Sequence, residues 1–211
     1  MTARDDVLAR VRQALADVPS KEPSSVKRAP VPGQPVVDLV ELFTERVADY
    51  RASVRHCSAE NAPAAIAELI PAETQLVVPA GFPADLLPDN AEFVTDTETS
   101  PLIAAVLDQV DVVITTCVVG IATTGTVVLD HGPGQGRRAL SLVPDVHICV
   151  IRAEQIVADV PDAIARLDPA RPQTWISGPS ATSDIELSRV EGVHGPRTLH
   201  VVVIEGDKPP A

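Results

Sequence analysis

Hydrophobic and polar positions follow helical and strand periods in turn along this chain. Near the N-terminus, apolar residues recur with a helical period and predict an amphipathic helix over residues 4–17. From residue 36 onward, short apolar runs typical of buried strands alternate with helical patterns. Such an alternation predicts an α/β domain in which helices cover both faces of a largely parallel sheet.

The predicted strands are short and rich in β-branched residues. They cover residues 53–57, 75–79, 92–95, 111–116, 126–129, 146–151 and 199–204. The predicted helices cover residues 38–50, 58–70, 99–108, 153–157 and 161–167. Ser58 is the predicted cap of the second helix and Thr99 or Ser100 that of the third, with Pro63 and Pro101 in first turns that tolerate proline.

The first helix is separated from the rest by a proline-rich stretch, residues 19–35, which predicts a linker. We therefore expect two parts: a helix-and-linker arm over residues 1–35 and an α/β domain over residues 36–211. An isolated helix of this length is only marginally stable in water. One expectation is that it packs on a neighbouring subunit, which would make the protein a homo-oligomer through this arm.

The charge and the apolar runs of the chain argue against two classes of partner, nucleic acid and membrane. The formal net charge is −12, which argues against nucleic acid, since phosphate backbones are held by clustered Lys and Arg. No apolar run approaches the ~20 residues of a membrane helix, and the charged N-terminus does not resemble a secretory signal. We predict a cytoplasmic protein with neither membrane nor nucleic-acid partners.

Three cysteines, Cys57, Cys117 and Cys149, lie far apart and form no CxxC pair. Iron–sulfur clusters and structural zinc normally take four ligands at recognisable spacings. Each cysteine lies in an apolar stretch, which favours buried thiols. We predict no metal site and no cofactor in this chain.

Two polar segments follow the strand predicted over residues 111–116. In residues 120–130, Thr123, Thr124 and Gly125 place hydroxyls and flexible backbone between two strands, which would suit a carboxylate or phosphate. A simple hairpin turn explains the same residues and is favoured on pattern alone. In residues 131–138, glycines spaced by two do not match the GxGxxG fingerprint, but the flexible loop next to Arg137 and Arg138 could bind an anion. A mobile surface loop is equally compatible.

Two further polar segments lie near the C-terminus. In residues 177–192, Ser180, Thr182 or Ser183 could cap a short helix, and Asp184 could serve as a base or orient a histidine. Ordinary helix capping is the favoured explanation of these residues on pattern alone. In residues 193–200, His194 and Arg197 flank a Gly–Pro turn, where a histidine could move protons or hold a carboxylate. His147, inside a predicted strand, is most simply a hydrogen-bonded core residue.

Together these segments resemble one known family. The runs GIATTGTVVLDHGPGQGRRALSLVPDVHICVIRAEQIV, ISGPSATSDIE and GVHGPRTLHVVVIE are similar to the signature of the LUD domain, in particular the lactate-utilisation protein C family. The likeness is strongest over residues 111–205. It implies the fold of the sugar-phosphate isomerase and CoA-transferase superfamily, a three-layer α/β/α sandwich with a mostly parallel mixed sheet. It also implies two iron–sulfur partner proteins, with which family members oxidise L-lactate to pyruvate.

One position departs from that family. Where it often has Glu in an A-E-T-G-T segment, this chain has Thr123. Related transferases use a glutamate in a strand-end loop as nucleophile, whereas a threonine without a nearby base is a weak one. Whether the chain is an enzyme by itself therefore stays open.

Three functions remain open on the sequence. The first is a cluster-free subunit of the L-lactate utilisation system that binds a small anion. The second is a stand-alone enzyme acting on a small carboxylate, an acyl-CoA or a sugar phosphate, and the third is a ligand-sensing regulatory protein. For an anion-binding pocket, the candidate ligand-binding residues are Thr123, Thr124, Gly125, Arg137, Ser180 and Arg197. Asp184 and His194 are the candidate catalytic pair that would move protons.

Overall fold

The computed structural model describes residues 2–17, 38–89, 91–182, 190–192 and 194–206. The linker predicted over residues 19–35 lies outside the described residues. Contacts within the chain divide it into two compact units, Met1–Val36 and Val37–Ala211. Within the described ranges, no helix is both long and apolar enough to cross a membrane.

The N-terminal helix α1 spans Ala3–Ala14, as the apolar period predicts. Thr2 caps it: its hydroxyl accepts the Asp5 N–H at 3.4 Å, and the Asp5 carboxylate accepts the Thr2 N–H at 2.9 Å. The apolar stripe of Val7, Val11 and Leu15 is exposed. An oligomer formed through this helix stays a prediction.

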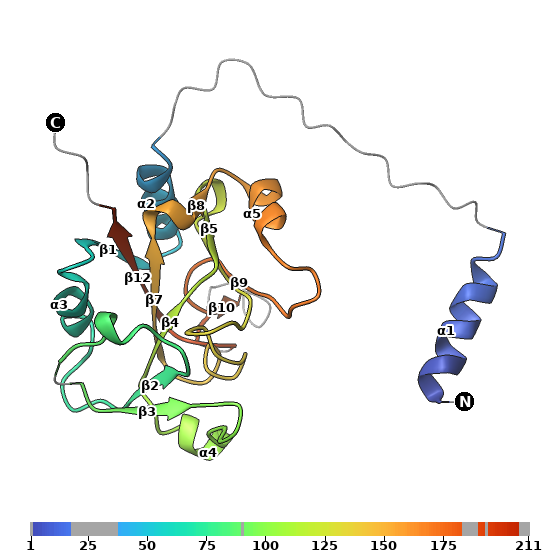
Figure 1. The fold of residues 1–211 in the computed structure, drawn as a ribbon, viewed down its shortest axis with the longest axis horizontal. Helices are drawn as coiled ribbons and strands as arrows, with labels where there is room; N and C mark the ends of the chain where they lie inside the picture. Colours follow the sequence, from blue (N-terminus) through green and yellow to red (C-terminus); the bar gives the residue numbers. More distant parts are fainter. Residues whose placement is uncertain (1, 18–37, 90, 183–189, 193, 207–211) are drawn as a thin grey trace. The chain divides into compact units, whose positions relative to one another are not determined.

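The second unit is built on a six-stranded sheet (Figure 1). Its order is β1 (Ser53–Ser58), β12 (Thr198–Glu205), β7 (Val146–Arg152), β4 (Val112–Thr116), β2 (Leu76–Pro79) and β3 (Phe93–Asp96). Every neighbouring pair in this sheet is parallel. The central strands β7 and β4 are apolar on both faces because both faces are covered.

One face of this sheet packs against the helix α3 (Ala62–Ala67) and the short 3₁₀ turn η1 (Ala84–Leu86). The other face is covered by α2 (Leu39–Asp49), α4 (Ala104–Leu107) and a second, smaller sheet. The predicted layered α/β fold is therefore confirmed, with a sheet in place of part of one helical layer.

The smaller sheet has the order β8 (Ile156–Val157), β5 (Val119–Ile121), β6 (Thr126–Leu129) and β9 (Thr174–Ile176). Its β5–β6 and β6–β9 pairs are antiparallel. We predicted one sheet with both parallel and antiparallel pairs; in the structure, the antiparallel pairs lie in this smaller sheet and the main sheet is all parallel. The helix α5 (Val160–Arg166) packs against it through Ala163. Two antiparallel strands of two residues each, β10 (Ala181–Thr182) and β11 (Val190–Glu191), lie between β9 and β12 in the chain.

Two predicted helices begin later than expected. The helix predicted from residue 58 begins at Ala62, because Ser58 still pairs with Glu205 at the end of β1. The helix predicted from residue 99 begins at Ala104. Its expected first turn is instead held by side chains: Thr97 accepts the Ser100 N–H at 2.9 Å, and Asp96 accepts that of Leu102 at 2.8 Å.

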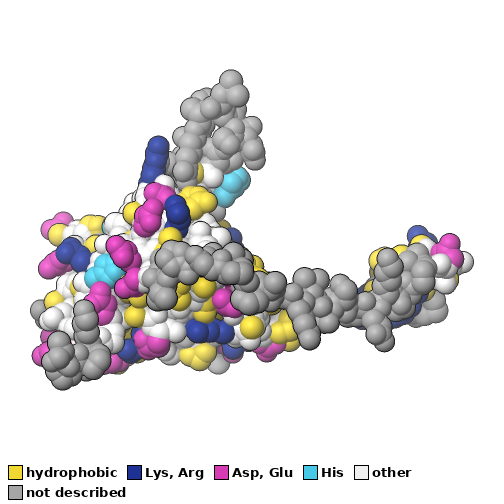
Figure 2. Space-filling model, turned by 90° about the horizontal axis from the view of Figure 1, so that it is seen from above, with side chains coloured by type: hydrophobic (Ala, Val, Ile, Leu, Met, Phe, Trp, Pro, Cys, Tyr) yellow, Lys and Arg dark blue, Asp and Glu magenta, His cyan; other side chains and the backbone are white. Residues whose placement is uncertain are grey.

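The segment predicted as a helix over residues 153–157 is a 3₁₀ turn, η3 (Ala153–Gln155), followed by β8. The strand β10 at Ala181–Thr182 also shows that no helix begins at Ser180. Residues 183–189 of that predicted helix lie outside the described residues. On the face seen in Figure 2, acidic and basic side chains are interspersed.

Candidate functional site

The segment with Thr123, Thr124 and Gly125 is the turn between β5 and β6. Residues Ala122–Thr124 form the 3₁₀ turn η2, and Gly125 follows with φ +56°. A Cβ on Gly125 would lie 2.6 Å from the carbonyl carbon of Arg46 in α2. The close packing on α2, together with the left-handed backbone, accounts for a glycine here.

A chain of hydroxyl groups leads from this turn to a cavity. The Thr124 and Thr126 hydroxyls are 2.7 Å apart, and the Thr126 hydroxyl is 2.7 Å from that of Ser177. Ser177 lines the cavity, whereas Thr124 lies two hydrogen bonds behind it. Thr123 is exposed outside the cavity, and its N–H donates to the Ala158 carbonyl at 3.1 Å.

This cavity, the Ser180–His194 cavity, has a volume of about 150 Å³. It lies near the amino ends of β7 and β12, beside the loop that leads into β7. The segment after β9 and the turn before β12 form its other walls. The residues that line it are Arg138, Ser141, Leu142, His147, Trp175, Ile176, Ser177, Gly178, Pro179, Ser180, His194, Gly195, Pro196 and Leu199.

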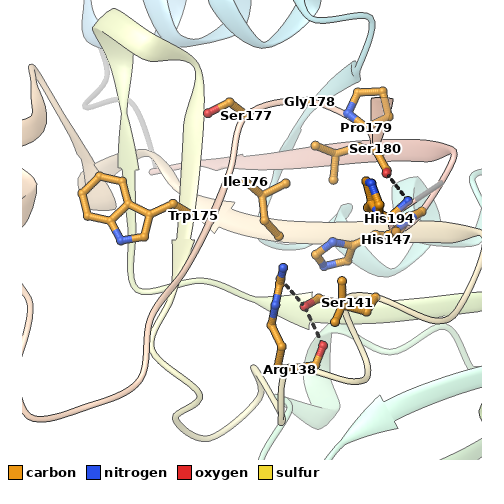
Figure 3. Close-up of a pocket in the computed structure, with 14 residues that line it drawn as sticks. Arg138, Ser141, His147, Trp175, Ile176, Ser177, Gly178, Pro179, Ser180 and His194 are labelled. Carbon is orange, nitrogen blue, oxygen red and sulfur yellow. Dashed lines mark hydrogen bonds between the residues drawn. The ribbon is translucent and has the colours of Figure 1, made fainter. Parts of the chain in front are cut away.

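Ser180 and His194, two of the predicted site residues, meet here. The His194 backbone N–H donates to the Ser180 hydroxyl at 3.1 Å. The Ser180 backbone N–H donates to the Pro196 carbonyl at 2.8 Å, which holds the two segments together. In Figure 3 these residues lie on one side of the view and Arg138 with Ser141 on the other, with His147 between them.

The cavity wall has an unusual charge for this protein. Its described lining includes an arginine, two histidines and three serines, but no Asp or Glu. The whole chain has 29 acidic residues against 17 Lys and Arg, so a wall without a carboxylate contrasts with the surface as a whole. A guanidinium binds a carboxylate through two parallel hydrogen bonds. This composition therefore favours an anion.

His147 forms the floor of the cavity and is 1% exposed. Its Nε2 lies 2.8 Å from the Thr115 hydroxyl, as expected of a hydrogen-bonded core histidine. Burial lowers the pKa of His147 to about 4, so its imidazole is neutral at neutral pH. One ring nitrogen of a neutral imidazole donates and the other accepts.

The other predicted residues lie elsewhere. Arg137 is not part of the cavity wall and forms two hydrogen bonds to Asp96, with Nε–Oδ2 and Nη2–Oδ1 distances of 3.0 Å. Arg197 is exposed beside Asp145, with 3.6 Å between charged atoms, and is not part of the cavity wall. Asp184 lies outside the described residues, so its role stays a prediction.

Of the polar residues in the cavity wall, Ser141 and Ser177 were not predicted, and His147 was predicted only as a core residue. Arg138 was considered beside Arg137 as an anion-binding alternative, but only Arg137 was kept as a candidate. The only sequence signal for Arg138 was its place in an Arg–Arg pair, which does not say which arginine faces a pocket. Its Nη1 donates to the Ser141 hydroxyl at a long 3.4 Å. A ligand carboxylate could therefore replace this weak contact at small loss.

The thiols of Cys117 and Cys149 are buried, as predicted, but Cys57 is only half-buried because it lies on the edge strand β1. In the described part of the chain, no group of three or more His, Cys, Asp or Glu side chains is placed to hold a metal ion.

Comparison with known proteins agrees with the sequence motifs. The LUD domain model matches residues 40–204. A lactate utilization protein C of Deinococcus radiodurans is 44% identical over 208 residues, covering 96% of this chain and 95% of that protein. Another, from Halalkalibacterium halodurans, is 35% identical over 106 residues, covering 46% of each chain.

A solved structure gives the same result for the fold. The crystal structure of a DUF162 family protein from Deinococcus radiodurans matches with a TM-score of 0.69 and 42% identity, covering 82% of this chain and 100% of that one. Because the family model spans most of the α/β unit and a relative matches over nearly the whole length, this chain is a member of the LUD domain family, in the group of the lactate utilization C proteins.

Proposed function

We propose that this protein acts in lactate utilisation by binding a small carboxylate, L-lactate or pyruvate, in the Ser180–His194 cavity. The observation that carries the proposal is a described cavity wall with Arg138 and no carboxylate, in a chain of net charge −12. The cavity is smaller than the ~300–1,000 Å³ typical of sites for drug-sized ligands, which favours an acid of a few carbons.

In this proposal Arg138 binds the carboxylate through two hydrogen bonds. The hydroxyls of Ser141, Ser177 and Ser180 complete the polar wall. The neutral His147 on the floor contacts the oxygen on the second carbon, as donor to a keto group or acceptor from a hydroxyl. This would let one cavity hold both the hydroxy acid and the keto acid.

Proton transfer at the cavity belongs to His194, with Asp184 as the expected partner. His194 is exposed beside Ser180 and could exchange protons with solvent. Oxidation of L-lactate to pyruvate releases two electrons and two protons. The electrons pass to the iron–sulfur partner proteins that the family resemblance implies, so this chain is the cluster-free, anion-binding subunit of a cytoplasmic system.

The other open functions find less support. A transferase of the related kind would need its glutamate nucleophile in the cavity, but the corresponding position is Thr123, which is exposed outside it, and the described lining has no Asp or Glu. We therefore favour a binding subunit over a stand-alone transferase.

Growth complementation tests this function. A strain in which the gene is deleted should fail to grow on L-lactate but grow normally on glucose. The wild-type gene and the Arg55→Gln variant should restore growth, because Arg55 pairs with Glu68 on the surface, far from the cavity lining. The Arg138→Gln variant should not restore it, although immunoblots should show equal protein levels.

Two outcomes would contradict the proposal. Normal growth of the deletion strain on L-lactate would remove the pathway assignment. Full complementation by Arg138→Gln would remove the assigned role of this arginine and of its cavity.

A further inference from the structure

A second, larger cavity of about 780 Å³ lies at the carboxyl ends of strands in the main sheet, whereas the Ser180–His194 cavity lies at amino ends. Its walls come from the carboxyl ends of β2 and β3, at Ala80, Gly81 and residues 96–99, and from the loop of residues 131–137. Arg171, from the segment after α5, completes it. We call it the Arg171 cavity. It shares no lining residue with the Ser180–His194 cavity.

Its position is the one that parallel sheets use for ligands. Strands β2 and β4 are neighbours in the sheet. After β2 the chain continues to β3, on the side away from β4, whereas after β4 it continues to β7, on the side away from β2. Connections that depart in opposite directions open a crevice at the carboxyl ends of the strands. The Ala80–Gly81 segment of the cavity wall directly follows β2 at this crevice.

Two arginines that line this cavity are each held by an ion pair with a buried aspartate. The Asp96 side chain, 4% exposed, holds Arg137, and the Asp130 side chain, 10% exposed, holds Arg171 at 3.2 Å. The arginine side chains are 40% and 41% exposed, and both line the cavity. A guanidinium has five N–H donors, and each aspartate engages only part of them. Arg137 Nη2 also donates to the Leu102 carbonyl. The donors left for an anion are therefore those on Arg137 Nη1 and those that Arg171 does not use for Asp130.

The loop of residues 131–137 is a fixed wall. The Gly134 N–H donates to the Ala80 carbonyl at 2.9 Å, and the Thr116 N–H donates to the Gly134 carbonyl at 2.8 Å. At the start of the loop, His131 has φ +61°, a left-handed conformation that is rare outside glycine and concentrated at functional sites. Its Nε2 lies 3.0 Å from the Thr174 hydroxyl.

We propose that the Arg171 cavity is a second binding site, for an organic phosphate with an apolar body. Its volume suits a molecule much larger than lactate. Ala80, Pro101 and Pro133 supply apolar wall, while Arg137 and Arg171 supply fixed donors. A phosphate has more acceptor oxygens than a carboxylate, so it can engage two guanidiniums at once.

Two carboxylates line the cavity, Asp96 and Glu98. Arg137 pairs with Asp96, whereas the negative charge of Glu98 would repel a phosphate. Replacing Glu98 by glutamine should therefore tighten binding, whereas replacing an arginine should weaken it. Changes of opposite direction at residues of opposite charge are the signature expected of an anion site.

Calorimetric titration of the full chain tests the proposal. The probe is ADP, a diphosphate on a planar body, with adenosine, pyrophosphate and citrate as comparisons. We expect ADP to bind more tightly than any of these. The Arg171→Gln variant should weaken ADP binding about tenfold to a hundredfold, the loss expected for a charge-assisted hydrogen bond, and Glu98→Gln should tighten it.

Two further variants separate the cavities. Thr99→Trp should block ADP by filling the mouth without altering either ion pair, which covers the case that Arg171→Gln fails to fold. Arg138→Gln, which changes a charge in the other cavity, should leave ADP affinity unchanged while it weakens L-lactate binding. Arg171→Gln and Thr99→Trp should keep L-lactate binding, so this proposal and the lactate proposal can fail independently.

The following results would overturn the proposal. They are an absence of ADP binding, binding of adenosine, pyrophosphate or citrate as tight as that of ADP, or ADP affinity unaffected by Thr99→Trp in the folded protein.

Discussion

At the scale of single residues, two adjacent arginines show how position decides role. Arg137 is locked to buried Asp96, whereas Arg138 has only a long contact to a serine and faces the Ser180–His194 cavity. Nothing in the pattern of residues 131–138 distinguishes them, because neither helix nor strand periodicity orders this loop. The sequence therefore identified the right segment, but not the side chain that faces the cavity.

The buried histidine gives a prediction about pH. Burial lowers the pKa of His147 to about 4, below the ~6.5 of an exposed histidine. The unfolded chain thus takes up a proton near pH 6.5, which the folded chain resists until about pH 4. Between these values, the free energy of unfolding should fall with falling pH, by up to about 3 kcal/mol from this group.

Urea denaturation at several pH values measures this effect. The His147→Gln variant removes the titrating group, so the wild type should lose more stability than the variant between pH 6.5 and pH 4.5. Carboxylates elsewhere titrate in both proteins and cancel in the difference. Parallel curves for the two proteins would contradict a neutral, buried His147.

At the scale of elements, the hydrophobic pattern was informative where it was long. Strands β2, β4 and β7 follow apolar runs, because both of their faces are buried. The three-residue strands β5 and β9 were not predicted, since so few residues carry no clear period. The helix start predicted at residue 99 was misplaced because Thr97 and Asp96 accept backbone N–H groups there, contacts that depend on the folded strand end.

The turn between β5 and β6 carries an element-scale prediction. Gly125→Ala should destabilise the protein by about 1–3 kcal/mol, since the backbone is left-handed there and a Cβ would lie 2.6 Å from α2. Gly206→Ala is the matched control, because a Cβ there has nothing within 4 Å. Its stability should stay within about 0.5 kcal/mol of wild type. Equal urea midpoints for the two variants would contradict the packing of this turn.

At the scale of the whole molecule, the polar segments singled out in the sequence contribute to two separate cavities. Ser180 and His194 meet near the amino ends of β7 and β12, whereas Arg137 lies at the carboxyl ends of β2 and β3. We expected one pocket for all these residues, on the assumption that the polar turns in the C-terminal half of the chain lie close together. The loop of residues 131–142 instead contributes to both cavities, which a linear pattern does not reveal.

The central claim is that a small carboxylate binds in the Ser180–His194 cavity. Titration of isotope-labelled protein with L-lactate, followed by backbone amide NMR, tests it most directly. We predict shifts concentrated at Ser177, Gly178, Gly195 and Leu199, and affinity about tenfold to a hundredfold weaker in Arg138→Gln. Shifts at Ala80, Gly81 and Thr97 instead, or no saturable shift, would contradict the account.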